Sequence, residues 1–437
     1  METVSVDVIV AGGGPAGITA AITCAKAGLK VLLIERGKFC GAKNMFGGAI
    51  YAQPMKEIFP NFEENAPLER KTSEHKYAIL TENEGTVISY KNQYSENTSY
   101  SVIRSKFDRW MGDEAQKAGV IILDETVVLA PIVDNDYVVG VKTELEDIYA
   151  KVVILADGVN SLLAKQLGLR ENLETKDVAL SVKEVIKLDK QKINDRFNLN
   201  DREGCIWEIF GSSMLNELGI GFLYTNEDSI SIGLGITLNE LVEKRQKAYE
   251  LLETLKKHPV ISPLIKDGEL IEYSAHLIPE GGFKKIPKLY ANGVMVSGDA
   301  AMLVNNLHWE GTNLAMISGK FAGETAISAI KKDDVSEESL CEYQSKLENS
   351  FVMKDLKAYR NLMSAAHRRK KSFFGFYFEK INEFFEMFTS TDSIPKRTKY
   401  FKFIKNFLFE RSITEIFKDA WGVMEILWGI LYDRIRQ

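Results

Sequence analysis

The sequence predicts an α/β fold. A doubly wound, Rossmann-like nucleotide-binding domain is interrupted by a mainly antiparallel α+β domain and followed by a helical tail. Three observations lead to this prediction: a glycine-rich turn joins an apolar strand to a helix near the N-terminus, alternating apolar residues with glycine breaks fill the middle of the chain, and aromatic residues gather near its end. Each pattern has the periodicity of the element that it predicts.

The first elements form a β-α-β unit. Residues 4–10 are typical of a buried strand, residues 16–27 of a helix and residues 30–34 of a second strand. The alternating stretch at 178–237 predicts a mainly antiparallel sheet. The other expected elements are helices near 106–118 and 313–331 and short strands at 120–123, 138–142, 152–156 and 293–296.

The order of these elements predicts a chain that leaves the nucleotide-binding domain and later returns to it. We assign residues 1–175 and 285–335 to that domain and residues 176–284 to an inserted substrate domain. Residues 336–437 form a helical, aromatic-rich region for membrane or partner docking. Because ligands commonly bind between domains, we expect a cleft there.

Length and charge limit the classes of protein. A chain of 437 residues predicts two or three domains, and a formal net charge of −6 argues against a dedicated nucleic-acid binder. The apolar run at residues 6–10 is short and contains Asp7, so it does not predict a signal peptide. No stretch reaches the ~18 apolar residues of a spanning helix. We expect a cytoplasmic protein.

The cysteines predict neither a metal site nor a disulfide framework. Iron–sulfur and zinc sites usually need closely spaced cysteines such as C-x-x-C. The four cysteines lie far apart, at Cys24, Cys40, Cys205 and Cys341. We therefore expect no metal on this chain and a reducing compartment.

The glycine-rich turn matches a dinucleotide fingerprint. Gly12, Gly14 and Gly17 satisfy the G-x-G-x-x-G spacing, which allows a tight turn, a close approach of backbone to a pyrophosphate and close helix–strand packing. The phosphates would meet the N-terminus of the following helix. Glu35 ends the second strand, where a carboxylate can accept hydrogen bonds from ribose. The residues of this unit that we predict to bind the dinucleotide are Gly12, Gly14, Pro15, Ala16, Gly17 and Glu35.

Later residues favour FAD over NAD. Arg104 can pair with a pyrophosphate, and Asp157-Gly158 and Gly298-Asp299 each follow a short apolar strand. An acid at such a strand end can hold sugar or ribityl hydroxyls. Together with the fingerprint, these segments resemble the FAD family that includes aromatic hydroxylases and prenyl reductases. The resemblance implies bound FAD and a domain of the glutathione-reductase/p-hydroxybenzoate-hydroxylase type. Because no second fingerprint for NAD(P)H is present, electrons are expected from a protein partner or from substrate.

Three further segments resemble the electron-transfer-flavoprotein:quinone oxidoreductase family, and specifically its FixC-like branch. The first joins Glu35-Arg36-Gly37 to Gly41-Ala-Lys43-Asn44 and Gly47-Gly48. The second is Glu272-Tyr-Ser-Ala-His276-Leu-Ile-Pro-Glu-Gly-Gly282. The third runs from Gly298-Asp-Ala-Ala301 to Asn305-Asn-Leu-His308-Trp-Glu310-Gly311-Thr312-Asn313-Leu-Ala-Met316. We expect the similarity to extend from residue 5 to about 365.

By this resemblance, the protein takes electrons from an electron transfer flavoprotein onto FAD and passes them to a membrane quinone. Backbone N–H groups at residues 311–313 would stabilise the reduced ring at its N1–C2=O edge. The resemblance adds these cofactor-binding residues: Arg36, Lys43, Asn44, Gly47, Gly48, Gly311, Thr312 and Asn313, with Glu310 beside the ring. It names no catalytic acid.

One departure from the family pattern concerns its iron–sulfur cluster. Mitochondrial-type relatives carry a C-terminal ferredoxin-like part with cysteine ligands, whereas this chain has no cysteine after Cys341. This chain is more similar to the other branch of the family, in which a separate small ferredoxin-like iron–sulfur subunit supplies the cluster. The resemblance therefore implies such a partner, and a location at the inner face of the cell membrane.

The tail is unusually aromatic. Of the last 65 residues, 17 are aromatic, against 10% of the whole chain. Phe384, Phe385 and Phe388 recur at helical spacing, as do Trp421 and Trp428. Core packing gives this pattern, and so does an amphipathic helix at a membrane surface. We favour membrane or partner docking.

Single residues admit simpler interpretations. His276 and His308 can relay protons to a quinone or merely be held by local hydrogen bonds. Cys40 is expected to pack in the core rather than act in redox chemistry. The run at residues 206–210 is expected to pack in the core rather than contact the cofactor.

Three alternatives remain at this stage. The first is a prenyl-lipid (geranylgeranyl) reductase, which shares the fold and the FAD signature. The second is an electron-relay and assembly subunit that holds FAD while docking other chains. The third is a flavin monooxygenase.

Overall fold

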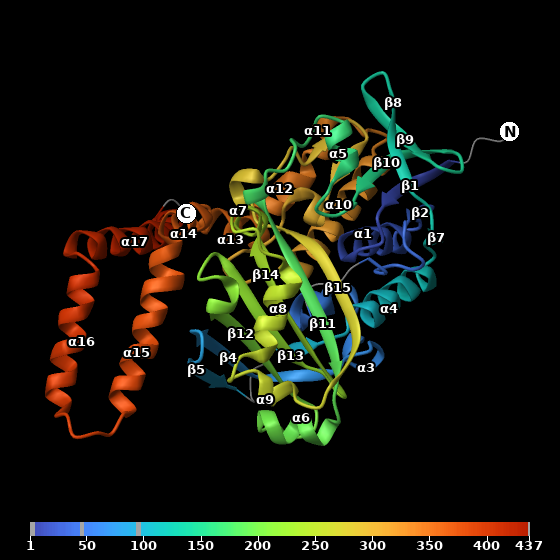
Figure 1. The fold of residues 1–437 in the computed structure, drawn as a ribbon. Helices are drawn as coiled ribbons and strands as arrows, with labels where there is room; N and C mark the ends of the chain where they lie inside the picture. The colour runs from blue at the N-terminus through green and yellow to red at the C-terminus, as the bar shows by residue number, and fades with distance from the viewer. Residues whose placement is uncertain (1–4, 44–47, 93–97, 436–437) are drawn as a thin grey trace. The chain divides into compact units, whose positions relative to one another are not determined.

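The computed structural model describes residues 5–43, 48–92 and 98–435, and the chain forms two compact units (Figure 1). The first unit comprises Met1–Glu69, Asn97–Val178 and His276–Arg360. The second comprises Arg70–Glu96, Ala179–Ala275 and Asn361–Gln437. The three functional domains assigned from the sequence stay a prediction.

The first unit contains a largely parallel sheet in the order β16-β17-β10-β1-β2-β7. β1 (Ser5–Ala11) pairs in parallel with β10 (Asp147–Leu155) and with β2 (Val31–Ile34). These strands read as continuous apolar runs because a parallel sheet is covered on both faces. The remaining strands of this path are β17 (Val294–Val296), β7 (Ile121–Leu123) and β16 (Tyr290–Ala291).

Two helices of the first unit pack very closely. α1 (Pro15–Lys26) follows β1, and α10 (Thr312–Lys331) follows the strand β17 after a loop. A Cβ on Gly319 of α10 would lie 2.0 Å from the backbone oxygen of Ala16, so only glycine allows this approach. The first turn of α1 is thereby held against the interior of α10, at Gly319.

The other elements of the first unit complete this core. They are β3 (Ala49–Tyr51), α2 (Ala52–Ile58), α3 (Phe62–Asn65), β6 (Ser99–Ser101), α4 (Arg104–Lys117), β8 (Val128–Asp134), β9 (Tyr137–Thr143), α5 (Leu162–Gln166), α11 (Glu337–Leu340), α12 (Glu342–Asn349) and α13 (Phe351–Ala358).

The second unit is built on a mainly antiparallel sheet, as predicted. Its path runs β15-β11-β14-β13-β12-β4, and β5 pairs with β4. The pairing of β12 with β4 is parallel. The strands are β4 (Arg70–Leu80), β5 (Gly85–Lys91), β11 (Val178–Lys187), β12 (Glu203–Gly211), β13 (Gly219–Thr225), β14 (Ser229–Thr237) and β15 (Glu269–Pro279).

Helices cover one face of this second sheet. Alternate strand residues such as Ile209, Leu223 and Ile232 form a buried core with side chains of α6 (Lys190–Phe197) and α8 (Ala248–Lys257). Successive strand residues point to opposite faces. Residues such as Glu208 therefore lie on the other face. The shorter helices are α7 (Leu238–Glu243) and α9 (Ser262–Ile265).

The C-terminal part of the second unit is helical. α14 (Leu362–Lys370) continues through the π-helical turn η5 (Lys371–Phe376) into α15 (Tyr377–Thr389), and α16 (Lys396–Glu410) and α17 (Ile413–Ile435) follow. α15 and α16 lie side by side as an antiparallel pair (Figure 1). Among the described helices, none is long and apolar enough to cross a membrane.

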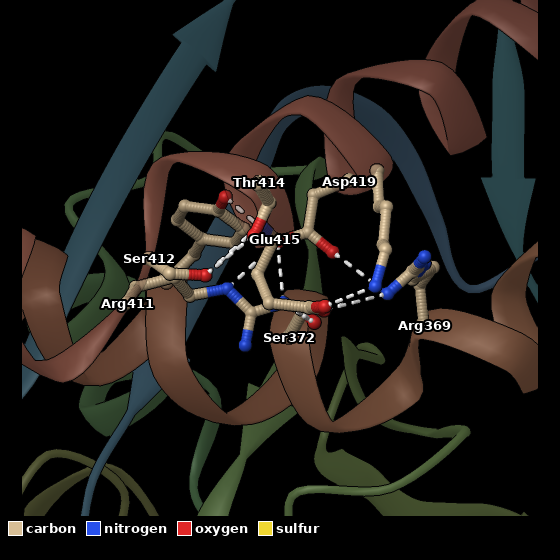
Figure 2. Close-up of polar contacts among 9 residues, drawn as sticks. Arg369, Ser372, Arg411, Ser412, Thr414, Glu415 and Asp419 are labelled. Carbon is tan, nitrogen blue, oxygen red and sulfur yellow. Dashed lines mark hydrogen bonds and ion pairs between the residues drawn. The ribbon is translucent and has the colours of Figure 1, made fainter.

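A polar cluster holds the helical segments together (Figure 2). Arg411, between α16 and α17, donates from Nε to Asp419 Oδ2 at 2.8 Å and also donates to Ser372 Oγ. Arg369 of α14 pairs with Glu415 at 3.1 Å. Because Asp419 is almost completely buried, this cluster anchors α17 against α14 and η5.

Candidate cofactor site

The glycine-rich turn adopts the geometry that the fingerprint predicts. Gly12 has a φ of +116°, and a Cβ there would lie 2.2 Å from the Ala156 oxygen. A Cβ on Gly17 would lie 2.0 Å from the Gly12 oxygen. Any side chain at either position would collide with backbone, which fixes the turn against β1 and β10.

The N-terminus of α1 has the geometry of an anion-binding site. Gly14 is the N-cap residue in an extended conformation, and Pro15 is the first helical residue, followed by Ala16. The N–H groups of a first helical turn have no intrahelical acceptor, and the helix dipole places partial positive charge there. This end can bind a pyrophosphate.

Glu35 lies at the same turn. Its Oε2 accepts from Gly13 N at 2.8 Å and its Oε1 accepts from Gly37 N at 2.6 Å. The buried carboxylate is thereby held beside the glycine turn, and its contact with a ribose stays a prediction.

The segment after β2 is described only in part. Arg36 and Lys43 are exposed, whereas Gly48 is buried and its oxygen accepts from Val102 N at 2.8 Å. Asn44 and Gly47, also predicted to bind the cofactor, lie outside the described residues.

The structure brings together Arg104 and Thr312, which are 208 residues apart. Arg104 begins α4, and its Nη1 lies 3.2 Å from the Thr312 hydroxyl at the first residue of α10. The guanidinium also pairs with Asp108 at 2.8 Å. A buried, oriented guanidinium is suited to a phosphate or another anion.

Two predicted acids follow parallel strands of the same sheet. Asp157 follows β10, and Asp299 follows β17. Burial raises the pKa of Asp299 to about 6, although Arg104 and Arg170 partly oppose this change. Burial also raises the pKa of Asp157. Their neighbours Gly158 and Gly298 make backbone hydrogen bonds, from Ser161 N to the Gly158 oxygen and from Gly298 N to Ser318 Oγ.

Sequence reasoning missed Arg170. Its Nη1 donates to the Val159 oxygen at 2.8 Å and to the Ala300 oxygen at 3.1 Å, and its charge acts on both Asp157 and Asp299. It follows a short helix with no motif around it, so no local spacing marked it. Its position makes it the cation shared by the two acids.

Unpaired polar atoms mark where a ligand fits. Asp157 Oδ1, Asn305 Nδ2 and Asn313 Oδ1 are buried, with no hydrogen-bond partner among the described residues. Buried polar atoms normally have partners, so these three indicate groups that a polar ligand would satisfy. Asn313 stands in the first turn of α10, whose N-cap residue is Gly311. The residues present therefore fit an elongated nucleotide such as FAD.

The loop before α10 is tightly folded. Asn305 and Glu310 exchange backbone hydrogen bonds, and Trp309 has a φ of +51°. Burial raises the pKa of Glu310, and the exposed His308 has its Nε2 3.3 Å from the Tyr359 hydroxyl. A second acid, the half-buried Glu280, was missed. Burial raises its pKa to about 7, and Asn306 donates a hydrogen bond to it.

Two other interpretations concern single residues. Cys40 is buried beside Gly13 and Gly112, and burial raises the pKa of its thiol to about 12. A thiol with that pKa stays protonated and unreactive at neutral pH, in agreement with a packing role. Burial lowers the pKa of His276, and the charges of Arg36 and Arg104 lower it further, so this imidazole is held neutral.

Comparisons with known proteins identify the family. A model of FAD-dependent oxidoreductases matches residues 7–166, and a model of the ETF-QO/FixC family C-terminal domain matches residues 362–427. Protein FixC of Bradyrhizobium diazoefficiens is 41% identical over 423 residues, which cover 95% of this chain and 97% of the relative. Protein FixC of Escherichia coli K12 is 41% identical over 361 residues, covering 82% and 84%.

Solved structures share the fold. A geranylgeranyl bacteriochlorophyll reductase-like protein from Thermoplasma acidophilum superposes with a TM-score of 0.71 at 22% identity, covering 87% of this chain and 91% of that one. The flavin-dependent brominase Bmp2 gives a TM-score of 0.63 at 16% identity, covering 93% and 100%. At these identities the likeness shows the fold alone.

The comparisons confirm the FAD-binding α/β fold, the FAD cofactor and the FixC-like resemblance predicted from the sequence. The predicted end of the similarity near residue 365 is wrong, because the family's C-terminal domain matches the aromatic tail. The chain belongs to the ETF-QO/FixC family, as a FixC-like, FAD-dependent oxidoreductase of electron transfer.

Proposed function

We propose that this protein receives electrons from an electron transfer flavoprotein on its FAD and passes them to a membrane quinone. A separate small ferredoxin-like iron–sulfur subunit works with it. The observation that carries this proposal is the identity of 41% to protein FixC over 95% of the chain. The iron–sulfur partner is proposed from the resemblance to the FixC-like branch of the family.

The cofactor's phosphates and ribose are assigned to the first β-α-β unit. The N-terminus of α1 binds the pyrophosphate, and Glu35 accepts from the ribose hydroxyls once the ligand competes with Gly13 N and Gly37 N. Arg104 adds a cation that Asp108 keeps oriented. When bound, the flavin exchanges one or two electrons, which links a two-electron donor to a one-electron cluster.

The flavin ring is assigned to the N-terminus of α10. The backbone of residues 311–313 lies at this positive helix end, where it stabilises negative charge on the reduced ring. The side chain of Asn313 supplies an unpaired oxygen and Asp157 another. Asp299, with a pKa of about 6, holds ribityl hydroxyls while Arg170 limits its desolvation penalty.

The C-terminal helices are assigned to the membrane surface. α16 exposes Phe401, Ile404, Leu408 and Phe409, and Lys402 and Lys405 lie exposed among them. α17 exposes Phe417, Trp421, Met424 and Trp428. Apolar side chains interleaved with lysines suit the boundary between acyl chains and anionic headgroups, from which an apolar quinone must come.

Anaerobic flavin spectroscopy tests the proposed electron path. The purified holoprotein is offered NADH, NADPH and a reduced electron transfer flavoprotein separately, and a menaquinone analogue is then added. We expect the flavin to be reduced by the partner flavoprotein alone and reoxidised by the quinone. Prompt reduction by NADPH without a partner would contradict the proposal and favour the prenyl-lipid reductase alternative.

A further inference from the structure

Arg170 is a buried cation that contacts two separate strand ends of the first unit. It is 7% exposed, and its Nη1 donates to the Val159 oxygen at 2.8 Å and to the Ala300 oxygen at 3.1 Å. Val159 lies two residues after Asp157, which follows β10. Ala300 lies one residue after Asp299, which follows β17. One nitrogen of the guanidinium thereby bridges the two segments that carry the predicted cofactor acids.

The turn before Arg170 fixes its backbone. The chain leaves α5 through Gly168, whose φ of +69° is a left-handed conformation that glycine readily adopts at helix ends. Leu169 N then donates to the Ala164 oxygen at 2.9 Å, and the Leu169 oxygen accepts from Lys288 N at 3.2 Å. Because Leu169 is held at both its N–H and its oxygen, the Arg170 side chain starts from a fixed position and loses little further backbone freedom.

The positive charge of Arg170 is not neutralised by a direct ion pair. Besides the two backbone oxygens it contacts Met302 Sδ at 2.7 Å, and among the described residues it forms no ion pair with a carboxylate. Burial lowers the pKa of the guanidinium, whereas the charges of Asp157, Asp299 and Asp177 oppose this change. Such interactions act at a distance and are stronger in the protein interior than in water.

Both cofactor acids are favoured in their ionised form by this charge. Asp157 Oδ2 accepts from Leu163 N at 3.1 Å, and Asp157 Oδ1 is buried with no hydrogen-bond partner among the described residues. Burial raises the pKa of Asp157, and it raises the pKa of Asp299 to about 6, while the charge of Arg170 opposes both changes. An ionised carboxylate accepts stronger hydrogen bonds than a protonated one. Arg170 therefore favours the form of each acid that best binds the hydroxyl groups of a ligand.

Other charged groups lie near this set, and each belongs to a different element. They are Arg104 of α4, Lys165 of α5 and Asp177 of η1 (Thr175–Asp177), which pairs at 2.9 Å with Lys285 of η3 (Phe283–Lys285). The charge of Arg104 is the stronger of the two that oppose the raised pKa of Asp299, but its guanidinium is paired with Asp108. Arg170 combines its charge with contacts to the backbone of both acid-bearing segments.

We propose that Arg170 is a positioning residue for FAD. Its contacts hold the segments after β10 and β17 at one spacing, and its charge stabilises the carboxylates of Asp157 and Asp299 for hydrogen bonds with the cofactor's hydroxyl groups. The inference rests on the assignment of these two acids to FAD in the proposed function, and it goes further because Arg170 stands outside every cofactor motif of the sequence. The clamp and the charge can be tested separately, since lysine keeps the charge but lacks the planar fork of the guanidinium.

The test measures the dissociation constant of FAD for flavin-free protein between pH 5 and 9, by the quenching of flavin fluorescence on binding. In the wild type, binding should weaken as pH falls through about 6, because Asp299 then takes up a proton. Arg170→Met removes both the clamp and the charge, so it should weaken binding at least about tenfold at pH 8. The weakening with falling pH should also begin at higher pH, because Asp299 loses a charge that opposes its raised pKa. Arg170→Lys should weaken binding less and keep the wild-type pH profile.

Arg196→Met is the matched control. Arg196 of α6 likewise donates from Nη1 to two backbone oxygens, of Leu264 at 3.1 Å and of Lys266 at 2.6 Å, but it belongs to the second unit. It should lower thermal stability, while the dissociation constant of FAD and its pH profile stay as in the wild type. Thermal unfolding shows whether each flavin-free variant is folded, and Arg170→Lys carries the test alone if Arg170→Met does not fold.

The outcomes separate the two proposals. Wild-type affinity in either Arg170 variant, or the wild-type pH profile in Arg170→Met, would overturn the role of Arg170 and leave the FAD assignment in place. If Asp157→Asn and Asp299→Asn also bind FAD as the wild type does, the assignment of the two acids fails and the role of Arg170 fails with it. Reduction of the holoprotein by NADPH alone would overturn the proposed electron path but not the role of Arg170.

Discussion

Arg104 and Asp108 form a two-point ion pair one turn apart on α4. Arg104 Nε lies 2.9 Å from Asp108 Oδ1, and Nη2 lies 2.8 Å from Oδ2. Asp108 is fully buried, and the same guanidinium reaches Thr312 at the start of α10. The pair thereby ties the first turns of two helices that lie far apart in the chain.

Asp108→Asn should destabilise the protein, because it leaves the buried Arg104 guanidinium without its counter-charge. We expect the free energy of unfolding to fall by about 3 kcal/mol, as for other broken buried ion pairs. Urea denaturation measures this value. Asp113→Asn, at an exposed position of the same helix, should change it by less than about 0.5 kcal/mol. Equal effects of the two substitutions would contradict the assigned role.

Gly319→Ala should separate α10 from α1, because the new methyl group meets the Ala16 backbone oxygen. We expect a loss of stability of about 2 kcal/mol and a purified protein with less flavin per chain. The ratio of flavin to protein absorbance reports the second effect. In the control Gly235→Ala, the nearest atom lies 3.7 Å from the new Cβ, so flavin content should not change.

Asp299 gives the flavin-free protein a defined pH dependence. Its folded pKa of about 6 exceeds the ordinary value of 3.8, so the folded state binds a proton more tightly than the unfolded state. The contribution of Asp299 to stability should be fully present below about pH 4 and should fall by about 3 kcal/mol as pH rises from about 4 to 6. Asp299→Asn should remove this fall in denaturation experiments on stripped protein. It should also weaken flavin binding.

Lys370 anchors α14 to the rest of the second unit. It pairs with Glu217 at 3.0 Å and with Glu240, and both carboxylates are almost completely buried. Burial opposes ionisation of Glu217, but hydrogen bonds with Lys244 and Lys370 outweigh it and lower the pKa. Lys370→Met should therefore cost about 2 kcal/mol of unfolding free energy at pH 7.

The same linkage fixes the pH profile of that variant. A lowered carboxyl pKa contributes stability above its unfolded value of 4.5, and this contribution is lost as pH falls through the folded value. The difference between Lys370→Met and wild type should shrink below pH 4.5. Lys371→Met, at an exposed neighbour, serves as the control. A difference that stays constant down to pH 3 would argue against the ion pairs as its source.

The proposed membrane surface predicts a binding defect without unfolding. Phe401 and Phe409 are 72% and 89% exposed, so replacing both by serine should leave stability unchanged. Sedimentation with phosphatidylglycerol-containing vesicles should fall at least about tenfold, because each buried aromatic ring contributes about 2 kcal/mol. Leu145→Ser, at an equally exposed residue of the first unit, should bind normally. Undiminished binding of the double variant would place the docking surface elsewhere.

The patterns of neighbouring residues predicted the helices of the nucleotide-binding domain to within two residues at each end. The expected helix at residues 16–27 is α1 (Pro15–Lys26), and the expected helix at 106–118 is α4 (Arg104–Lys117). The one-residue difference at Pro15 arises because proline, which lacks an N–H, is tolerated at the first helical position. Glycine spacing and apolar runs involve residues that are close together in the chain, so they can be recognised in a single sequence.

Long-range features could not be predicted. The pairing of β4 with β12 was not expected, because β12 stands more than a hundred residues later. Arg170 was missed because its acids come from two other strands. The run at residues 206–210 was expected to pack in the core, and Trp207 and Ile209 do so. Glu208 lies between them on the opposite face, and only the strand register shows which side chains it meets.

The parallel pairing of β4 with β12 also has a consequence for biosynthesis. A ribosome adds about 5–20 residues per second, so β4 emerges on the order of ten seconds before the strand that it must pair with. During that interval its backbone edge has no native neighbour on that side, and exposed strand edges are templates for aggregation. Nascent chains of this protein should therefore depend on a chaperone between the synthesis of β4 and that of β12.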